Sequence, residues 1–441
     1  MEHSSPRRPP AAPPTTVTAP PKKRLLGIDA ARGLALIGLI AVHILPDSVE
    51  DTGEPTLAYT LFAGHSAALF ALLAGVGLAL ATGGRRPHSG RALTAGRLGL
   101  VARSVVIAAI ALAVAALMPP EDPPTVGILL YYASFFLLAL PFLHLRPRTL
   151  FLSAAAFALV SPLLIQVLYP VLPESSAWNH TVVDVIAEPG QTLADLLLTG
   201  TYPALTYMVF ILTGLGLGRL DLSRPAVQGT IAAIGTAMAV LSSAISSLLL
   251  HVFGGFEALV EAEEVTAEEL EELLAYGADT IPDTSAWWHA TATPHSGTAL
   301  ADVSSLGLAM AVLGVALLVT PRLGRWLMPL VAMGSMTLTL YTAHLIGLLP
   351  EGHYDEPELW FVLHLGVAVA FAWCWSRFRG RGPLEGLVHG AVGRVRTAVL
   401  GPRPSAGTPG TGTSAPGGEH PQDSAPAGTG STPGPVGSTR G

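Results

Sequence analysis

Charged residues are scarce in this sequence. Asp, Glu, Lys and Arg make up 12% of its 441 residues, whereas soluble proteins average roughly 25%. Half of the residues are hydrophobic. A soluble protein of this length needs more charge to cover its surface, so lipid must cover much of this one.

Cysteine is almost absent as well, because Cys374 is the only one. A single cysteine excludes a disulfide within the chain and a cysteine-based zinc site. The sequence has no P-loop, no dinucleotide-binding glycine fingerprint and no metal-spaced cluster of His and Cys. We therefore expect no metal, and no nucleic acid among the partners. The scarcity of Lys beside abundant Ala, Gly, Pro and Arg is typical of a high-GC bacterial genome.

What the sequence has instead is a series of apolar segments of about 20 residues, separated by turn-rich or charged breaks. They predict an all-α fold, a polytopic transmembrane helical bundle of about ten spans. The first segment is not a cleavable signal, because it is long and has no small-residue cleavage site at its end. The predicted spans lie near residues 26–46, 57–82, 98–118, 125–143, 149–170, 202–218, 226–251, 299–319, 327–349 and 359–377.

The distribution of basic residues supports this series of spans. If the N-terminus is cytoplasmic, all 24 Lys and Arg residues fall on or near the cytoplasmic side, and none falls in a loop assigned outside. That is the asymmetry that the positive-inside rule describes. We therefore predict both termini in the cytoplasm, a multi-pass protein of the cell (plasma) membrane, and the lipid bilayer as its main partner.

Outside the spans, the sequence predicts three kinds of segment. Residues 1–24 and 401–441 lack bulky apolar side chains and predict disordered tails on either side of one transmembrane domain, 25–400. The acidic external segment 252–298 has carboxylates and leucines at helical spacing, which predicts a short amphipathic helix, most simply a solvated acidic one. Residues 384–399 predict an amphipathic helix on the inner leaflet.

Ionisable groups in the spans are the candidates for function, because they are costly in lipid. Asp29 and Arg32 open the first span three residues apart, so they can pair on one helical face. His43 follows Arg32 by eleven residues, which is within about 20° of three full turns and about 16 Å along the axis. Arg32 and His43 therefore share one stripe, along which an anionic donor could be held at one end and react at the other. The alternatives are an interfacial ion pair and a histidine that reaches the outer interface.

Five histidines fall in the outer halves of predicted spans, and we interpret them as lining one polar cavity. A few of them could instead only bond across helices. The five are His43, His65, His251, His344 and His364. With Tyr341, His344 and His364 are the residues that we assign to a substrate cavity.

Residues 24–43, RLLGIDAARGLALIGLIAVH, resemble the first span of polytopic membrane acyltransferases. These include acyltransferase family 3 and the heparan-alpha-glucosaminide N-acetyltransferase-like proteins, in which an opening Asp is followed by Arg-Gly-Leu-Ala and a distal His. Residues 201–222, 294–314 and 333–349 also resemble a related bacterial membrane domain of unknown function. In the glucosaminide acetyltransferases the catalytic His stands beside Trp-Asn-Gly and an Asp, where this sequence has FAGHSAALF.

The resemblance implies transfer of an acyl group, such as acetyl, from cytoplasmic acyl-CoA to an extracytoplasmic acceptor such as a glycan or amino sugar. It makes His43 the catalytic base or transient acyl carrier, with His65 as the alternative. Arg32 would bind the donor or hold the helix, and Asp29 would orient it. The phosphates of CoA would lie against four inner arginines that otherwise only signal topology: Arg85, Arg86, Arg97 and Arg103.

Two other functions fit the same sequence. A transporter would also have many helices and a polar outer cavity, although no Asp or Glu falls in the middle of a predicted span. A catalytically inactive binding relative is the third candidate, because the motif of the second span is missing. The sequence leaves open whether the chain forms a homodimer.

Overall fold

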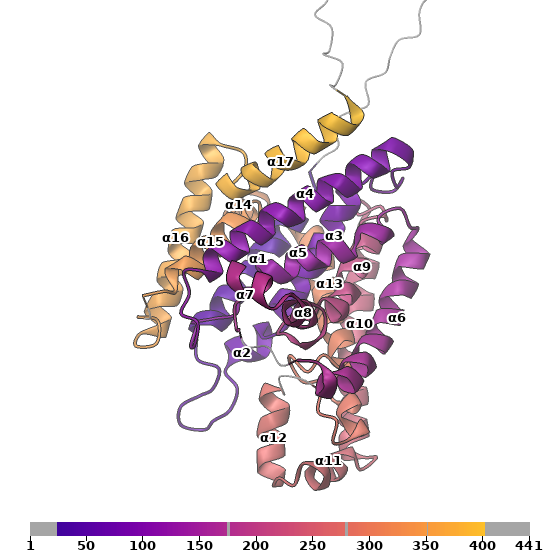
Figure 1. Cartoon of the computed structure of the whole chain (residues 1–441), viewed down its shortest axis with the longest axis vertical. Coiled ribbons are helices and arrows are strands. Elements are labelled where there is room, and N and C mark those ends of the chain that lie inside the picture. Colours follow the sequence, from indigo (N-terminus) through magenta and orange to yellow (C-terminus); the bar gives the residue numbers. More distant parts are fainter. Residues whose placement is uncertain (1–23, 174–176, 278–280, 351, 402–441) are drawn as a thin grey trace, which may run out of the picture. The chain divides into compact units, whose positions relative to one another are not determined.

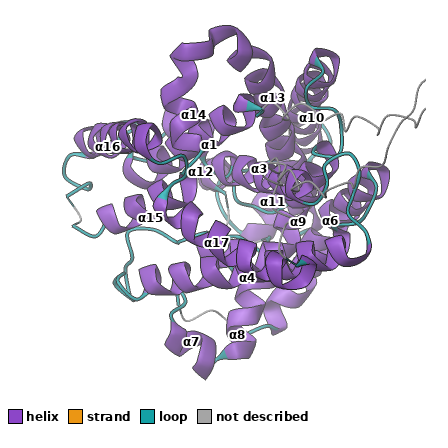
Figure 2. Ribbon diagram, turned by 90° about the horizontal axis from the view of Figure 1, so that it is seen from above, coloured by secondary structure: helices purple, strands orange, loops and turns teal. Residues whose placement is uncertain are grey.

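The computed structural model describes residues 24–173, 177–277, 281–350 and 352–401, and in these residues the chain is all-helical, without a named strand (Figures 1 and 2). The predicted all-α fold is therefore confirmed. Apart from Arg24 and Gly401, the two predicted tails lie outside the described residues.

The first half of the described chain runs from α1 to α9. Its elements are α1 (Leu26–Ile44), α2 (Leu57–Phe62), α3 (His65–Ala81), α4 (Gly90–Ala115), α5 (Leu129–Leu138), η1 (Leu140–Phe142), α6 (Pro147–Leu168), η2 (Tyr169–Val171), α7 (Val182–Ala187), α8 (Pro189–Ala194), η3 (Asp195–Thr199) and α9 (Ala204–Leu217).

The second half runs from α10 to α17. Its elements are α10 (Pro225–His251), α11 (Gly255–Glu263), α12 (Ala267–Tyr276), η4 (Ala286–Ala290), α13 (Ala299–Leu323), η5 (Gly324–Leu327), α14 (Met328–Gly334), α15 (Thr337–Gly347), α16 (Pro357–Phe378) and α17 (Pro383–Leu400).

Seven of the described helical segments are long and apolar enough to cross a membrane, and an eighth is a bent pair, Pro189–Thr199 with Ala204–Leu217. Helices also occupy the two other predicted spans, but they are shorter. The predicted span 125–143 contains the ten residues of α5, and the span 327–349 is divided into α14 and α15. The outer faces of α6, α10 and α16 expose large apolar side chains such as Leu159, Leu241 and Val362. These faces suit contact with lipid rather than water.

The loops fall into the same two groups that the basic residues indicated. Arg219 donates to the carbonyl oxygens of Thr82 and Leu143, and Arg85 pairs with Asp221, so three loops predicted inside meet at one end. At the other end, loops predicted outside meet one another. The Tyr59 hydroxyl donates to the Tyr276 carbonyl, and the Tyr276 hydroxyl to the Gly53 carbonyl. Gln166 Nε2 donates to the carbonyl of Pro282. The alternation of the loops between two ends thus agrees with the predicted order of spans.

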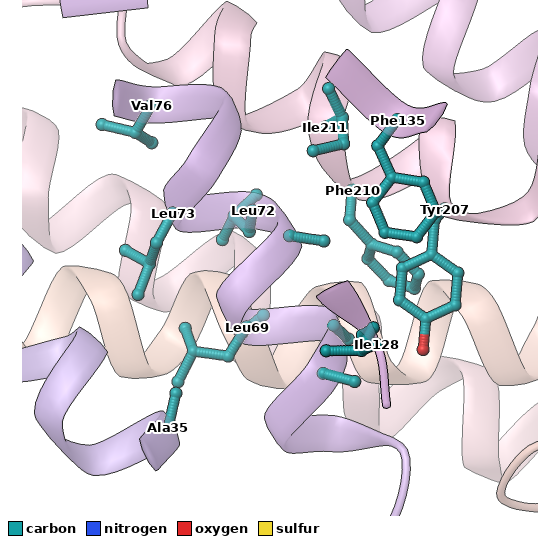
Figure 3. Close-up of a cluster of buried hydrophobic side chains, with 14 of the residues drawn as sticks. Ala35, Leu69, Leu72, Leu73, Val76, Ile128, Phe135, Tyr207, Phe210 and Ile211 are labelled. Carbon is teal, nitrogen blue, oxygen red and sulfur yellow. The ribbon is translucent and has the colours of Figure 1, made fainter. Parts of the chain in front are cut away.

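The core is built where α3 packs on α9 (Figure 3). A Cβ atom added to Gly214 of α9 would lie 1.9 Å from the carbonyl oxygen of Leu72, and one added to Gly75 would lie 2.1 Å from that of Ile211. Only glycine permits so close an approach of the two backbones, as is common between membrane helices. Gly75 and Gly214 therefore permit the close packing of α3 on α9.

The acidic segment forms two helices, so the prediction of a single helix was wrong. The chain breaks after α11 because Glu264 adopts a left-handed conformation with φ of 56°. Thr266 then begins α12 with a capping box, in which Glu269 accepts hydrogen bonds from the Thr266 backbone and hydroxyl. Leu259, Leu270 and Trp288 form a small core of their own beneath the acidic faces. The predicted helix at 384–399 is present as α17.

Candidate functional site

Three histidines from three helices form one hydrogen-bonded chain. Nδ1 of His43, at the end of α1, lies 3.0 Å from Nε2 of His344 on α15. Nδ1 of His344 lies 2.8 Å from Nδ1 of His364 on α16. The His43 and His344 rings are stacked, with centroids 5.2 Å apart. The imidazole of His43 therefore turns toward other helices and joins a continuous path for protons.

A neutral imidazole donates from one nitrogen and accepts at the other, so this chain can hold its protons in either of two orders. In one order, Nδ1 of His43 donates to Nε2 of His344, and Nδ1 of His344 donates to Nδ1 of His364. That order leaves the lone pair of His43 Nε2 free, and no described residue bonds to that atom.

The expected cavity of five histidines is therefore wrong in part. His65 belongs to another place, where its Nδ1 lies 3.0 Å from Oγ of Ser305 on α13. His251 is exposed at the end of α10, with its ring against Phe256. The depth of the five histidines in the predicted spans is similar, but it does not show which of them face one another, because side chains leave their helices in different directions.

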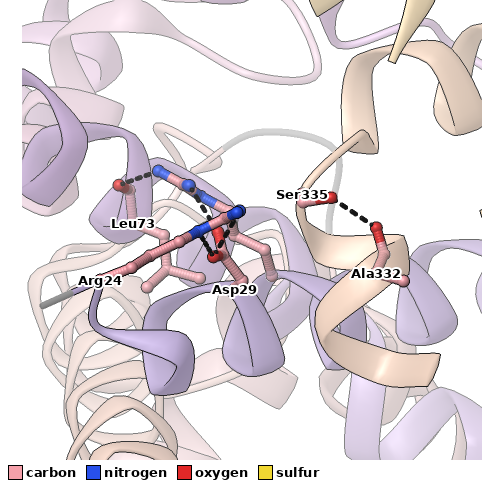
Figure 4. Close-up of polar contacts among 6 residues, drawn as sticks. Arg24, Asp29, Leu73, Ala332 and Ser335 are labelled. Atoms are coloured by element: carbon pink, nitrogen blue, oxygen red, sulfur yellow. Dashed lines mark hydrogen bonds and ion pairs between the residues drawn. The ribbon is translucent and has the colours of Figure 1, made fainter. Parts of the chain in front are cut away.

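At the other end of α1, Asp29 pairs with two arginines (Figure 4). Its buried carboxylate accepts from Arg24 at 2.8 Å and from Arg32 at 3.4 Å. The predicted Asp29–Arg32 pair is present, and Arg24 is a second partner that the spacing did not indicate. Arg32 also donates to the Leu73 carbonyl of α3 at 3.3 Å. The guanidinium of Arg32 is thus held between α1 and α3.

A second guanidinium lies within electrostatic range of Arg32. Arg103 of α4 experiences the charges of Arg32 and of Glu385 at the start of α17, and its guanidinium lies 4.9 Å from the centroid of the Phe136 ring. Its Nε is buried without a hydrogen-bond partner in the described chain. The hydroxyl of Tyr132, which both arginines influence, is also buried and unpartnered there. The unpartnered Arg103 Nε and Tyr132 hydroxyl, within the electrostatic influence of two cations, suit an anionic or polar group.

Tyr341 lies beside the histidine chain. Its ring centroid lies 6.2 Å from that of His43 and 6.4 Å from that of His344. Its hydroxyl accepts a hydrogen bond from the Ile128 amide and interacts electrostatically with Tyr132, on which Arg32 and Arg103 also act. Tyr341 is therefore the residue of the predicted substrate cavity that is closest in its interactions to both His43 and Tyr132.

The other three arginines predicted to bind the donor lie elsewhere. Arg85 and Arg86 are exposed in the loop after α3, where Arg85 pairs with Asp221 at 3.1 Å. Arg97 of α4 lies 3.5 Å from Nδ1 of His144. Of these four arginines, Arg103 is the one that interacts electrostatically with Arg32 among the described interactions.

The same loop region contains a buried arginine and a histidine with shifted pKa values. Burial lowers the pKa of Arg219 to about 10, although its guanidinium donates to backbone oxygens at the end of α3, in the turn after α3 and in the turn after η1. Burial, followed by the charges of Arg396 and Arg219, lowers the pKa of His88. Both groups belong to the basic end and do not touch the histidine chain.

Sequence reasoning missed a second polar cluster. Oδ2 of Asp195, in η3, lies 2.7 Å from Nε2 of His180 and accepts from the Tyr131 hydroxyl at 3.0 Å. All three side chains are buried, and His180 and Tyr131 line a mostly apolar pocket together with Asn179. The sequence placed Asp195 in an external loop, because no spacing signalled that the chain returns to the bundle there.

These features define a multi-pass membrane protein whose helices enclose a chain of histidines and a pair of arginines. A family model described as heparan-alpha-glucosaminide N-acetyltransferase, catalytic, matches residues 24–252, just over half of the chain. The chain therefore belongs to the heparan-alpha-glucosaminide N-acetyltransferase catalytic family, in agreement with the resemblance of its first span. No curated protein sequence matches the chain. The family match ends after α10, so His344 and His364 lie beyond it.

Proposed function

We propose that this protein transfers an acyl group, such as acetyl, from cytoplasmic acyl-CoA to an acceptor on the opposite side of a bacterial plasma membrane. The observation that carries this proposal is the chain His43–His344–His364, which leaves Nε2 of His43 unbonded and connects Nδ1 to proton acceptors. Membership of the acetyltransferase family supports the same reaction.

In the acyl-carrier form of the reaction, Nε2 of His43 attacks the thioester carbonyl. The C–S bond breaks and CoA leaves as the thiolate. Nδ1 of His43 then releases its proton to Nε2 of His344, which passes its own Nδ1 proton to His364. The acyl-imidazole is neutral, and the acceptor amine or hydroxyl attacks its carbonyl carbon, so the bond from that carbon to Nε2 breaks. His364 returns its proton through His344 to Nδ1 of His43, and the proton of the acceptor is lost to solvent. In the base form, Nε2 takes the acceptor's proton directly while the acceptor attacks the thioester.

The arginine pair is the proposed donor site. Arg32 and Arg103 supply two charges for the phosphates of CoA, and Tyr132 supplies a hydroxyl. Asp29 holds Arg32 from one side while the Leu73 carbonyl holds it from the other. The rise of about 16 Å between Arg32 and His43 separates the phosphate end of the donor from its reactive end.

The test is His43→Ala in purified full-length protein, supplied with radiolabelled acetyl-CoA and with glucosamine as the acceptor. We expect loss of label transfer, and His251→Ala, which alters an exposed histidine at a comparable position, should retain the wild-type rate. Mass spectrometry of the quenched wild-type protein separates the two forms of the reaction, because only an acyl carrier has label on His43. Unchanged transfer in His43→Ala would remove this residue from the mechanism.

A transporter remains the second candidate, because one observation favours it. The bent pair Pro189–Thr199 and Ala204–Leu217 turns by 53° at a short break, and broken helices of this kind form substrate sites in transporters. Uptake of radiolabelled glucosamine into liposomes that contain the protein but no acyl-CoA would support transport. Acetylated glucosamine that forms outside the liposomes only when acetyl-CoA is enclosed in them would support the enzyme.

A further inference from the structure

A second pocket lies where the broken span meets α13. Its wall includes the break itself, residues 199–203, together with the first turns of α9 and α13 and part of the segment that follows α12. The polar side chains in this wall come from two stretches of the chain, 199–207 and 295–305, and include Thr199, Thr206, His295, Ser296, Asp302 and Ser305. Such convergence is typical of a site for a polar ligand.

Two of these side chains are buried without a partner. Asp302 is 5% exposed, and its Oδ2 has no hydrogen bond within the described part of the chain. Thr206 is 3% exposed, and its hydroxyl is unpartnered in the same sense. A buried carboxylate is unfavourable unless something donates hydrogen bonds to it. Both residues line the pocket, so a ligand there could satisfy both.

The backbone of the pocket is also open to a ligand. The chain leaves helical geometry at Gly200 and resumes it after Pro203, so the amides at the start of α9 have no helical partner. Interrupted membrane helices expose backbone groups in this way where they line binding cavities.

His65 lies behind this pocket. It is bonded through Nδ1 to Ser305, whose side chain is part of the wall. The adjacent residue, Ser66, touches α1, because a Cβ atom added to Gly38 would lie 2.1 Å from the Ser66 Oγ. Gly38 precedes His43 by five residues on the same helix, so α1, which carries His43, packs against the helix that carries His65.

We propose that this pocket binds the acyl acceptor through its amine, which donates to Asp302, while the acceptor's hydroxyl groups bond to Thr206 and Ser305. His65 is then a positioning residue that orients Ser305. This inference rests on the proposed acyl transfer, because that reaction identifies the ligand as the acyl acceptor. It concerns binding alone, so it can be tested without acyl-CoA.

The test is binding of glucosamine to the purified full-length protein in the absence of acyl-CoA, measured by calorimetry. We expect glucosamine to bind at least tenfold more tightly than glucose, which has the hydroxyl groups without the amine. Asp302→Asn should lose that preference, and Asp355→Asn, which changes an exposed carboxylate, should keep it. Equal affinity for the two sugars, no binding of glucosamine, or a preference that survives in Asp302→Asn would overturn the proposal.

A second measurement does not depend on the folding of the Asp302 variant. In a Cys374→Ser background, Thr206→Cys places a single thiol in the pocket, and glucosamine should slow its reaction with a methanethiosulfonate reagent at least fivefold. Unchanged labelling would place the ligand elsewhere. If glucosamine binds as expected but no label transfer occurs with acetyl-CoA, the acyl-transfer proposal fails and the pocket assignment stands.

Discussion

His43 and His344 are 301 residues apart in the chain, yet Nδ1 of the first and Nε2 of the second lie 3.0 Å apart. This contact joins α1, within the region matched by the acetyltransferase family, to α15, which lies beyond it. The candidate catalytic histidine is therefore completed by the C-terminal third of the protein.

The first prediction concerns this contact. His344→Phe keeps an aromatic ring beside His43 but removes both nitrogens of the relay. We expect kcat for acetyl transfer to fall by about 10²- to 10⁴-fold, the usual contribution of a positioned proton acceptor, with little change in KM for acetyl-CoA. His251→Phe is the matched control. A kcat within threefold of wild type in His344→Phe would show that His43 acts without the relay.

The second prediction concerns the donor site. Arg103→Met keeps the length of the side chain and its packing against Phe136 but removes one of two charges near Tyr132. We expect KM for acetyl-CoA to rise by about tenfold or more, because a charged hydrogen bond contributes about 1.5–3 kcal/mol, while transfer from a short thioester without phosphates stays unchanged. Arg86→Met, in an exposed loop, should leave both values at wild type. Equal effects on the two donors would exclude a phosphate-binding role for Arg103.

The third prediction concerns the packing of α14 on α1. A Cβ atom added to Gly334 would lie 1.7 Å from the carbonyl oxygen of Asp29. Gly334→Ala must push the helices apart beside Asp29, and we expect a loss of about 1–3 kcal/mol, seen as a lower melting temperature in detergent. Gly366→Ala on α16 meets nothing within 4 Å and should not lower the melting temperature. Equal melting temperatures for the two variants would contradict this close contact.

The fourth prediction concerns pH and α12. Hydrogen bonds from the Thr266 backbone and then from its hydroxyl lower the pKa of Glu269. A carboxylate with a lowered folded pKa stabilises the helix above its unfolded pKa of about 4.3, and this stabilisation is lost as pH falls through the folded pKa. Hydrogen-exchange protection of α12, corrected for the intrinsic rate, should therefore be constant above about pH 5 and fall in more acidic solution.

Two variants on the same turn test this origin. In Glu269→Gln the decrease in hydrogen-exchange protection at acidic pH should vanish, because the amide side chain does not titrate. Glu268→Gln, which alters the neighbouring exposed carboxylate, should retain the wild-type profile. A decrease in protection that persists in Glu269→Gln would assign the pH dependence to another group.

Much of the fold was predictable because lipid imposes a strong pattern on sequence. The length of the apolar segments located the long helices. The distribution of basic residues divided the loops into two sets, and the loops of each set contact one another at their own end of the bundle. Arg219, Thr82 and Leu143 meet at one end, as their loops predicted. Hydropathy could not indicate that α5 has ten residues, or that Gly200 and Pro203 interrupt a span, because these features depend on tertiary packing.

The candidate site was predictable only along a single helix. The spacing of Asp29, Arg32 and His43 followed from helical geometry, and the Asp29–Arg32 pair is present. The contact of His43 with His344, and the position of His65 outside this histidine chain, both depend on which helices are neighbours in the fold. Asp195 was hidden for the same reason, since its partner His180 precedes it by 15 residues in an irregular segment.

Arg219 has a consequence for the order in which helices can assemble. Its Nη1 and Nη2 donate to the carbonyl oxygens of Ala79, Thr82, Gly84 and Leu143. All four acceptors precede Arg219 in the sequence, so they are synthesised before it. These bonds can therefore form only after α9 has been made and has come together with α3 and the turn after η1.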